Sequence, residues 1–130
     1  MNKVRGAKAY AKVGVESRVL SASQVGLIVQ LFNRAESEIR AALIHIDAGN
    51  IAERGQSISK AIEVVQNGLL ASLNMETEGD IATNLYNLYE YVVKLLMEAN
   101  RECSKEKLEQ ASKLLAPIAE SFRAIDAGSV

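Results

Sequence analysis

The stretch that decides the fold is NLYNLYEYVVKLLMEA, residues 84–99. Apolar residues recur in it at steps of three and four, the spacing of one face of an α-helix: Leu85, Leu88, Val92, Leu95 and Ala99. At about 100° per residue, Tyr91 falls on one flank of this stripe. A larger apolar group falls on the other flank: Tyr86, Tyr89, Val93, Leu96 and Met97.

The apolar arc of this helix is wider than one packed face requires. It spans roughly 220–240°, whereas a surface helix needs about 100° to face a core. We therefore expect contacts on both sides, one with the helix's own bundle and the other with a partner. Three tyrosines lie in this stretch, and each couples an apolar ring to a polar hydroxyl, which suits a half-exposed surface.

Length and composition favour one soluble domain. The chain has 130 residues, of which 48% are hydrophobic and none is Trp, so we expect an aliphatic core. A net charge of −1 argues against a generally basic nucleic-acid binder. Cys103 is the only cysteine, so an internal disulfide is excluded. Without an apolar run near 18 residues or a signal peptide, the sequence predicts a cytoplasmic protein with no membrane insertion.

Periodicity predicts an all-α fold, an antiparallel up-down four-helix bundle. The bundle is expected over residues 21–125, with a leader at 1–20 that is loosely structured or forms a short helix, and a tail at 126–130. The first helix is predicted to begin near residue 21 and to end at residues 47–50. The other three helices are predicted at about 51–73, 80–101 and 104–125.

The predicted helix ends rest on residues with known capping preferences. Ser21 or Ser23 can cap the first helix, and Ser104 can cap the fourth. Gly49 or Asn50 can take the left-handed conformation that ends the first helix.

Three residues interrupt the helical pattern. Gly55 and Gly68 each cost roughly 1 kcal/mol relative to Ala in a helix interior, a cost tolerated where another chain segment approaches closely. Pro117 removes a backbone donor and opposes the carbonyl of Lys113, so we expect the last helix to kink or break near 113–117.

Charge is uneven between the leader and the middle of the chain. Residues 1–20 hold five basic residues and one Glu. Residues 61–93 hold five acidic residues and no Lys or Arg. Two interpretations stay open. The imbalance is ordinary variation on solvated faces, or the leader lies across the acidic region.

The sequence contains no arrangement that predicts catalysis or a cofactor. One His cannot supply a metal site of two or more His ligands. His45 raises the alternative of a histidine phosphotransfer module, but such modules resemble His-x-x-Lys, and Ala48 stands at the Lys position. Near the end of its helix, His45 instead suits the negative end of the helix dipole. We expect a protein that is not an enzyme.

The chain resembles FliS-type flagellar secretion chaperones along most of its length. The likeness begins with Ala9-Tyr10, the Ser21-Ala22-Ser23 cap, Leu27-Ile28 and Leu31-Phe32. It continues through Gly55, residues 57–61, Asn67-Gly68-Leu69 and Ser72-Leu73, and then through residues 84–100. Two departures are Gln24-Val25-Gly26, where many relatives have a Pro, and Pro117.

The resemblance implies a cytoplasmic chaperone that binds the disordered C-terminal segment of flagellin. Such a chaperone prevents premature polymerisation and delivers flagellin to the flagellar type III export gate, without nucleotide or metal. An anti-sigma factor or an accessory chaperone is a further expected partner. The rival hypothesis from the residues is a generic helical adaptor whose second apolar face forms a homodimer.

Seven residues are predicted to bind the partner. Tyr10 is expected in a leader that covers the client site or contacts the export apparatus. The expected groove residues are Ile62, Val65, Leu69, Tyr89, Val93 and Leu96. For the three residues of the second helix, a place in the core is an equally good interpretation. For Tyr89 and Val93, on the flank of their stripe, partner contact is favoured.

Overall fold

The computed structural model describes residues 21–128 of the chain. Over this range the elements are α2 (Ala22–Ala48), α3 (Ile51–Glu63), a π-helical turn η1 (Val64–Leu69), a 3-10 turn η2 (Leu70–Ser72), α4 (Met75–Glu102) and α5 (Lys105–Asp126). The described residues form helices and no strand, which confirms the all-α prediction. Tyr10 and the whole predicted leader, residues 1–20, lie outside these residues, as do the last two residues of the predicted tail.

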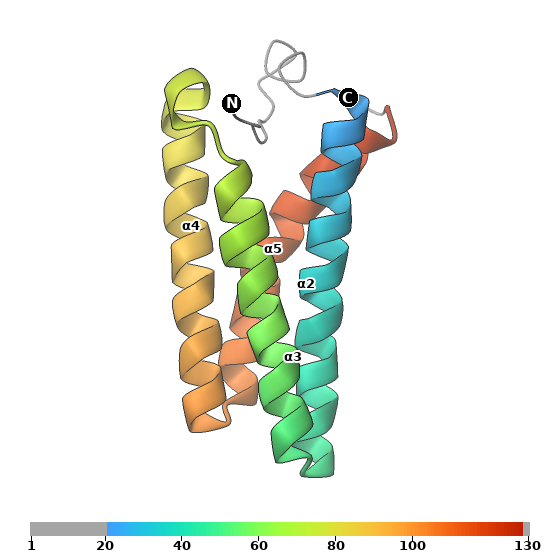
Figure 1. Cartoon of the computed structure of the whole chain (residues 1–130), viewed down its shortest axis with the longest axis vertical. Coiled ribbons are helices and arrows are strands. Elements are labelled where there is room, and N and C mark those ends of the chain that lie inside the picture. Colours follow the sequence, from blue (N-terminus) through green and yellow to red (C-terminus); the bar gives the residue numbers. More distant parts are fainter. Residues whose placement is uncertain (1–20, 129–130) are drawn as a thin grey trace.

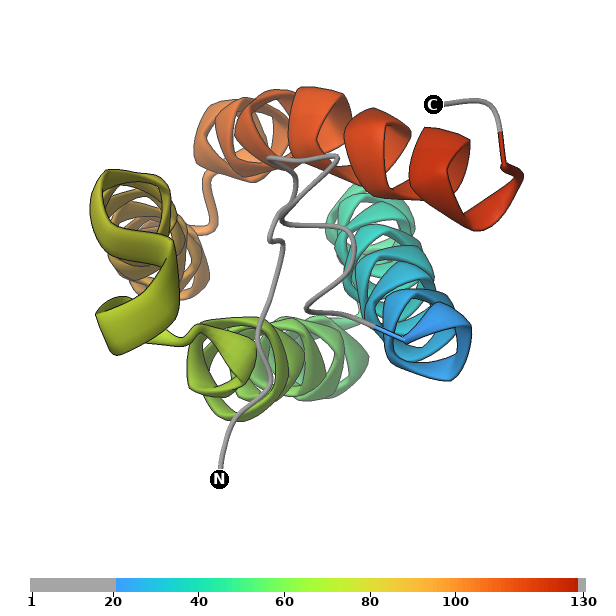
Figure 2. The same cartoon turned by 90° about the horizontal axis from the view of Figure 1, so that it is seen from above.

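The four long helices form an antiparallel bundle in which neighbours in sequence are neighbours in space. Seen from above, α2, α3, α4 and α5 follow one another around a ring (Figure 2). α5 runs obliquely, beginning beside the end of α4 and ending beside the start of α2 (Figure 1). Short connections favour this order because each helix returns alongside the one before it.

The core lies along the axis of the ring and is mainly aliphatic. Every long helix contributes fully buried side chains, among them Ile39, Ile58, Leu96 and Leu115. The aromatic part is small: the ring centroid of Phe32 lies 5.7 Å from that of Phe122 and 6.4 Å from that of Tyr89.

Most helix ends follow the predicted capping residues. The Ser21 hydroxyl accepts a hydrogen bond from the Gln24 backbone N–H, and the Gln24 side chain accepts one from the Ser21 N–H, a capping box. Gly49 ends α2 with φ 76°, and Ser104 caps α5. The exception is α3, because its N-cap Asn50 makes no side-chain hydrogen bond to the helix.

The second predicted helix continues to Ser72, but its last part is not a regular α-helix. Residues Val64–Leu69 widen into a π-helical turn, and Leu70–Ser72 tighten into a 3-10 turn. The side chain of Leu31 on α2 lies over Gly68 in the widened turn, so this glycine admits a close approach as predicted.

The third predicted helix starts one turn earlier than expected. The Asn74 side chain accepts hydrogen bonds from the backbone N–H groups of Glu76 and Thr77, so residues predicted as a loop form the first turn of α4. Gly79 then bends the chain with φ 56° and ψ −122°, a conformation that essentially only glycine adopts.

Pro117 does not break the last helix, so this prediction is wrong in its stronger form. α5 is one continuous helix from Lys105 to Asp126 with Pro117 inside it. Both Pro117 and Lys113 are exposed, so water can solvate the carbonyl that loses its intrahelical donor. The Ser121 hydroxyl donates to the Pro117 carbonyl at 3.2 Å and adds a local hydrogen bond. Among the described residues, no helix is long and apolar enough to cross a membrane.

Candidate protein-binding surface

The structure places most of the predicted groove residues inside the bundle. Val65, Leu69 and Leu96 are fully buried, and Tyr89 is 2% exposed. Ile62 is the exception, because it is half-buried at the edge of the core. For Val65 and Leu69 the core interpretation is therefore the one that the structure supports.

Tyr89 and Val93, for which partner contact is favoured from the sequence, lie in the core and not on an accessible flank of their helix. Val93 is only 7% exposed, and both side chains belong to the core. The physical reason is the ring arrangement, in which α4 packs against α3 on one side and α5 on the other. A helix that packs against two neighbouring helices needs a wider apolar arc than a helix that packs against one. Most of the apolar arc of α4 is therefore covered by α3 and α5.

The buried position of Tyr89 also sets its protonation. Desolvation raises the pKa of the Tyr89 phenol well above its ordinary value, and the negative charge of the Glu78 carboxyl raises it further. Burial therefore keeps Tyr89 a neutral phenol at alkaline pH, where an exposed tyrosine ionises.

The apolar residues that remain exposed are different from those predicted as groove residues. In the described part of the chain, seven large apolar side chains are exposed, and four of them lie on α4: Met75, Ile81, Tyr91 and Met97. The others are Leu27 and Ile44 on α2 and Ile51 on α3. The sequence analysis places Tyr91 and Met97 on opposite flanks of the apolar stripe, and both side chains are accessible in the structure.

One apolar strip follows the seam between α3 and α4, exposed at Ile51 and Met97 and buried at Val93. The Arg54 Nη2 donates to the Asn100 carbonyl at 3.3 Å, which fixes the level at which the two helices meet. The position that a Gly55 Cβ would take lies 3.9 Å from Asn100 Oδ1. The helices are antiparallel, so seven residues after Gly55 on α3 and seven residues before Asn100 on α4, Ile62 comes about level with Val93. We call Ile51, Gly55, Ile62, Val93 and Met97 the α3–α4 face.

The two glycines of the second helical segment differ in what surrounds them. A Cβ on Gly68 would lie 3.0 Å from Leu31 Cδ2, so that position is filled from within the chain. A Cβ on Gly55 would have only Asn100 Oδ1 nearby, at 3.9 Å. Gly55 is also half-exposed, and its surface is accessible to a partner.

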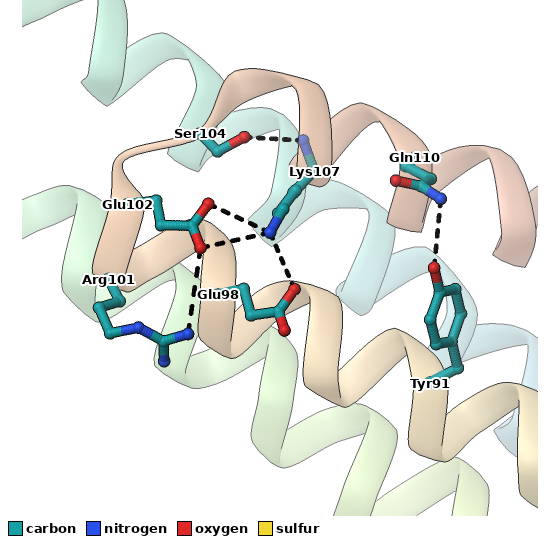
Figure 3. Close-up of polar contacts among 7 residues, drawn as sticks. All are labelled: Tyr91, Glu98, Arg101, Glu102, Ser104, Lys107 and Gln110. Carbon is teal, nitrogen blue, oxygen red and sulfur yellow. Dashed lines mark hydrogen bonds and ion pairs between the residues drawn. The ribbon is translucent and has the colours of Figure 1, made fainter.

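The lower seam between α4 and α5 is polar. The Lys107 ammonium lies between the carboxylates of Glu98, at 2.9 Å, and Glu102, at 3.1 Å (Figure 3). Its hydrogen bond lowers the pKa of the Glu98 carboxyl. One to two turns away, the Gln110 side-chain amide donates to the Tyr91 hydroxyl at 3.4 Å (Figure 3). These contacts fix Tyr91 at the surface with its ring exposed.

The remaining chemistry-bearing residues form no reactive cluster in the described range. No group of three or more His, Cys, Asp and Glu side chains could hold a metal ion within residues 21–128. His45 Nδ1 lies 3.4 Å from the Asn50 amide nitrogen near the end of α2, which fits a structural role. Cys103 is exposed and ends α4 in the left-handed conformation.

Comparison with known proteins connects this bundle to one family. The family model described as flagellar protein FliS matches residues 6–129. The flagellar secretion chaperone FliS of Salmonella typhimurium is 42% identical over 120 residues, 92% of this chain and 89% of the relative. The chain belongs to the FliS family.

Other FliS proteins are similar over nearly the same range. The flagellar secretion chaperone FliS of Escherichia coli is 37% identical, with 95% of this chain and 90% of the relative covered. That of Vibrio cholerae is 30% identical over 85% of this chain and 81% of the relative. These matches confirm the resemblance seen in the sequence, and FliS is a family of chaperones.

Proposed function

We propose that this FliS protein binds the C-terminal segment of flagellin in the cytoplasm. In this role it keeps flagellin from polymerising prematurely and delivers it to the export gate of the flagellar type III apparatus. The observation that carries the proposal is the accessible apolar surface on both flanks of α4. Met97 is 52% exposed and Tyr91 is 43% exposed, and the Tyr91 hydroxyl accepts a hydrogen bond from Gln110 of α5.

Such a surface suits an amphipathic helix of the client. A client helix can place its apolar face along exposed side chains of the chaperone, the helix-in-groove mode of recognition. Ile62 is the predicted groove residue positioned for direct contact, because it is half-buried. Val93 lies level with it at the border of the core. Val65, Leu69, Tyr89 and Leu96 would support the face from beneath.

Titration calorimetry with a peptide covering the C-terminal segment of flagellin from the same organism tests this proposal. We expect saturable one-to-one binding with a negative heat-capacity change, the sign of apolar burial. Absence of binding would overturn the flagellin assignment. A tight homodimer with no affinity for flagellin would favour the helical adaptor instead.

A pair of matched variants tests the surface itself. Met97→Asp puts a charge on the exposed α3–α4 face and should weaken flagellin binding with little change in thermal stability. Asn87→Asp adds the same charge to another exposed position of α4 outside that face, and should leave binding unchanged. Equal effects of the two variants would show that net charge, rather than this face, controls the interaction.

The same accessible surface could serve the other expected partners. An anti-sigma factor or an accessory chaperone would need an apolar helix or groove of its own to cover residues such as Met97 and Tyr91. Competition between such a protein and the flagellin peptide, measured in the same calorimeter, would show whether the two use one surface.

A further inference from the structure

A buried donor and a buried acceptor remain unpaired at the α3–α4 seam. The Arg54 Nε–H and the Asn100 Oδ1 are closed off from solvent and have no hydrogen-bond partner. Buried polar groups are nearly always paired, because leaving one unpaired costs the desolvation of that group. Arg54 Nε and Asn100 Oδ1 are therefore a donor and an acceptor that an additional hydrogen-bonding group can satisfy.

Gly55 places no side chain beside these atoms, which are themselves closed off from solvent. Asn100 Oδ1 is the only atom from outside the neighbouring backbone within 4 Å of the position that a Gly55 Cβ would take. The Arg54 head group is held to the Asn100 carbonyl by a single 3.3 Å hydrogen bond, at the long end of the range. Arg54 is also partly exposed, and a group that reaches these two atoms must displace its side chain.

The chemistry of the missing group follows from the two atoms. Arg54 Nε requires an acceptor, and Asn100 Oδ1 requires a donor. A carboxylate satisfies only the arginine and an ammonium satisfies only the asparagine. A main-chain amide inside a helix already uses both of its groups. A hydroxyl donates and accepts through a single oxygen atom, whereas the primary amide of an Asn or Gln side chain offers a carbonyl and an N–H2 group on two separate atoms, one for each partner.

We infer that Gly55, Arg54 and Asn100 form a docking point for a client helix that presents a side-chain amide at its closest approach. The inference rests on the proposed client binding and assigns a specific contact within it. Apolar residues on either side of that amide would pack on Ile51 and Met97, which are 71% and 52% exposed. Gly55 lets the client helix come near enough for the amide to reach both partners.

Gly55→Ala separates the docking role from a structural role. The added methyl group has room, and Ala favours the helix, so the melting temperature of the free protein should rise by about 3 °C. The same methyl group holds the client helix away, and we expect the dissociation constant for the flagellin peptide to increase about tenfold. Gln56→Ala is the control, since it also favours the helix but lies at the next, exposed position outside the face.

Asn100→Leu provides the second arm in the same titration. It removes the unpaired acceptor while the backbone carbonyl that binds Arg54 is kept, so the free protein should be no less stable. Binding of the flagellin peptide should again weaken about tenfold. Weaker binding by both variants with unchanged or higher melting temperatures supports the docking point.

Three outcomes would overturn the inference. Unchanged affinity in Gly55→Ala and Asn100→Leu, with wild-type binding intact, removes the docking point but leaves the proposed client function standing. A large loss of stability in Asn100→Leu with unchanged affinity shows that Arg54 and Asn100 pair with each other in solution. Absence of wild-type binding removes the client function and the docking point together.

Discussion

Gly68 lies directly against Leu31 of α2, with 3.0 Å between Leu31 Cδ2 and the position that a Cβ on Gly68 would take. Gly68→Ala should therefore destabilise the protein by about 1 kcal/mol, because overpacking outweighs the gain in helix propensity. Urea denaturation of the wild type and the variant measures this difference.

The background variant Leu31→Ala makes this prediction specific. With the leucine side chain removed, Gly68→Ala meets no neighbour and should stabilise the protein through helix propensity alone. If Gly68→Ala costs the same free energy in both backgrounds, the contact with Leu31 is not what requires glycine at this position.

Gly79→Ala should destabilise α4 through its backbone. The φ of 56° and ψ of −122° lie in a region that side chains exclude, so the expected cost is about 1–3 kcal/mol in the free energy of unfolding. Gly49→Ala is the matched control, since Gly49 also has positive φ and open space but lies in the left-handed helical region. If Gly79→Ala lowers the free energy of unfolding by less than Gly49→Ala does, the bend of α4 at Gly79 is contradicted.

The pair between Glu98 and Lys107 predicts a pH dependence of stability. Lys107 lowers the pKa of the Glu98 carboxyl, so the pair stabilises the fold at neutral pH and the contribution disappears as the pH falls through that lowered pKa. Glu98→Gln should be less stable than the wild type at pH 7 and equal to it at strongly acidic pH. Chemical denaturation at several pH values would show this convergence, and a gap that persists in acid would contradict it.

Tyr89 predicts a loss of stability in alkali. Its folded-state pKa is raised above the ordinary value of 10.0, so folding disfavours the tyrosinate, and stability falls as the pH rises above about 10. Tyr89→Phe removes this term and should shift the midpoint of alkaline unfolding to higher pH. Tyrosinate absorbance should rise for Tyr89 only together with loss of the helical circular dichroism signal.

Val93→Asp tests the corrected position of this residue. Val93 is buried in the core, so an aspartate there should lower the free energy of unfolding by about 3 kcal/mol or more. Guanidinium denaturation measures the loss. Stability close to that of the wild type would show that Val93 lies on an exposed flank of α4 and not in the core.

Local sequence features were enough to predict most of the fold. Ser21, Gly49 and Ser104 act where they were expected, because capping depends on residues within one turn. The start of α4 was predicted a turn late, since Gly79 was interpreted as part of a loop rather than as a bend after a capped first turn. Pro117 was expected to disrupt α5, and its exposed position explains why the helix continues.

The binding surface was less predictable because it depends on neighbours rather than on spacing. The helical wheel gives the width of the apolar arc of α4, but it does not show which part of the arc the two neighbouring helices cover. Partner contact was therefore favoured for Tyr89 and Val93, which are buried in the core. Gly55 and Gly68 are equivalent in a sequence. Only the packing of Leu31 over one and the open surface over the other distinguishes them.

Among the four long helices, α3 has the least stabilised start. Asn50 does not cap it with a side-chain hydrogen bond, whereas Ser21, Asn74 and Ser104 cap the other three helices. Its far end passes into the π-helical turn. Amide hydrogens of α3 should therefore exchange with deuterated solvent sooner than those of α2. A client lying on this helix would slow that exchange, so the chaperone would gain order from the protein it protects.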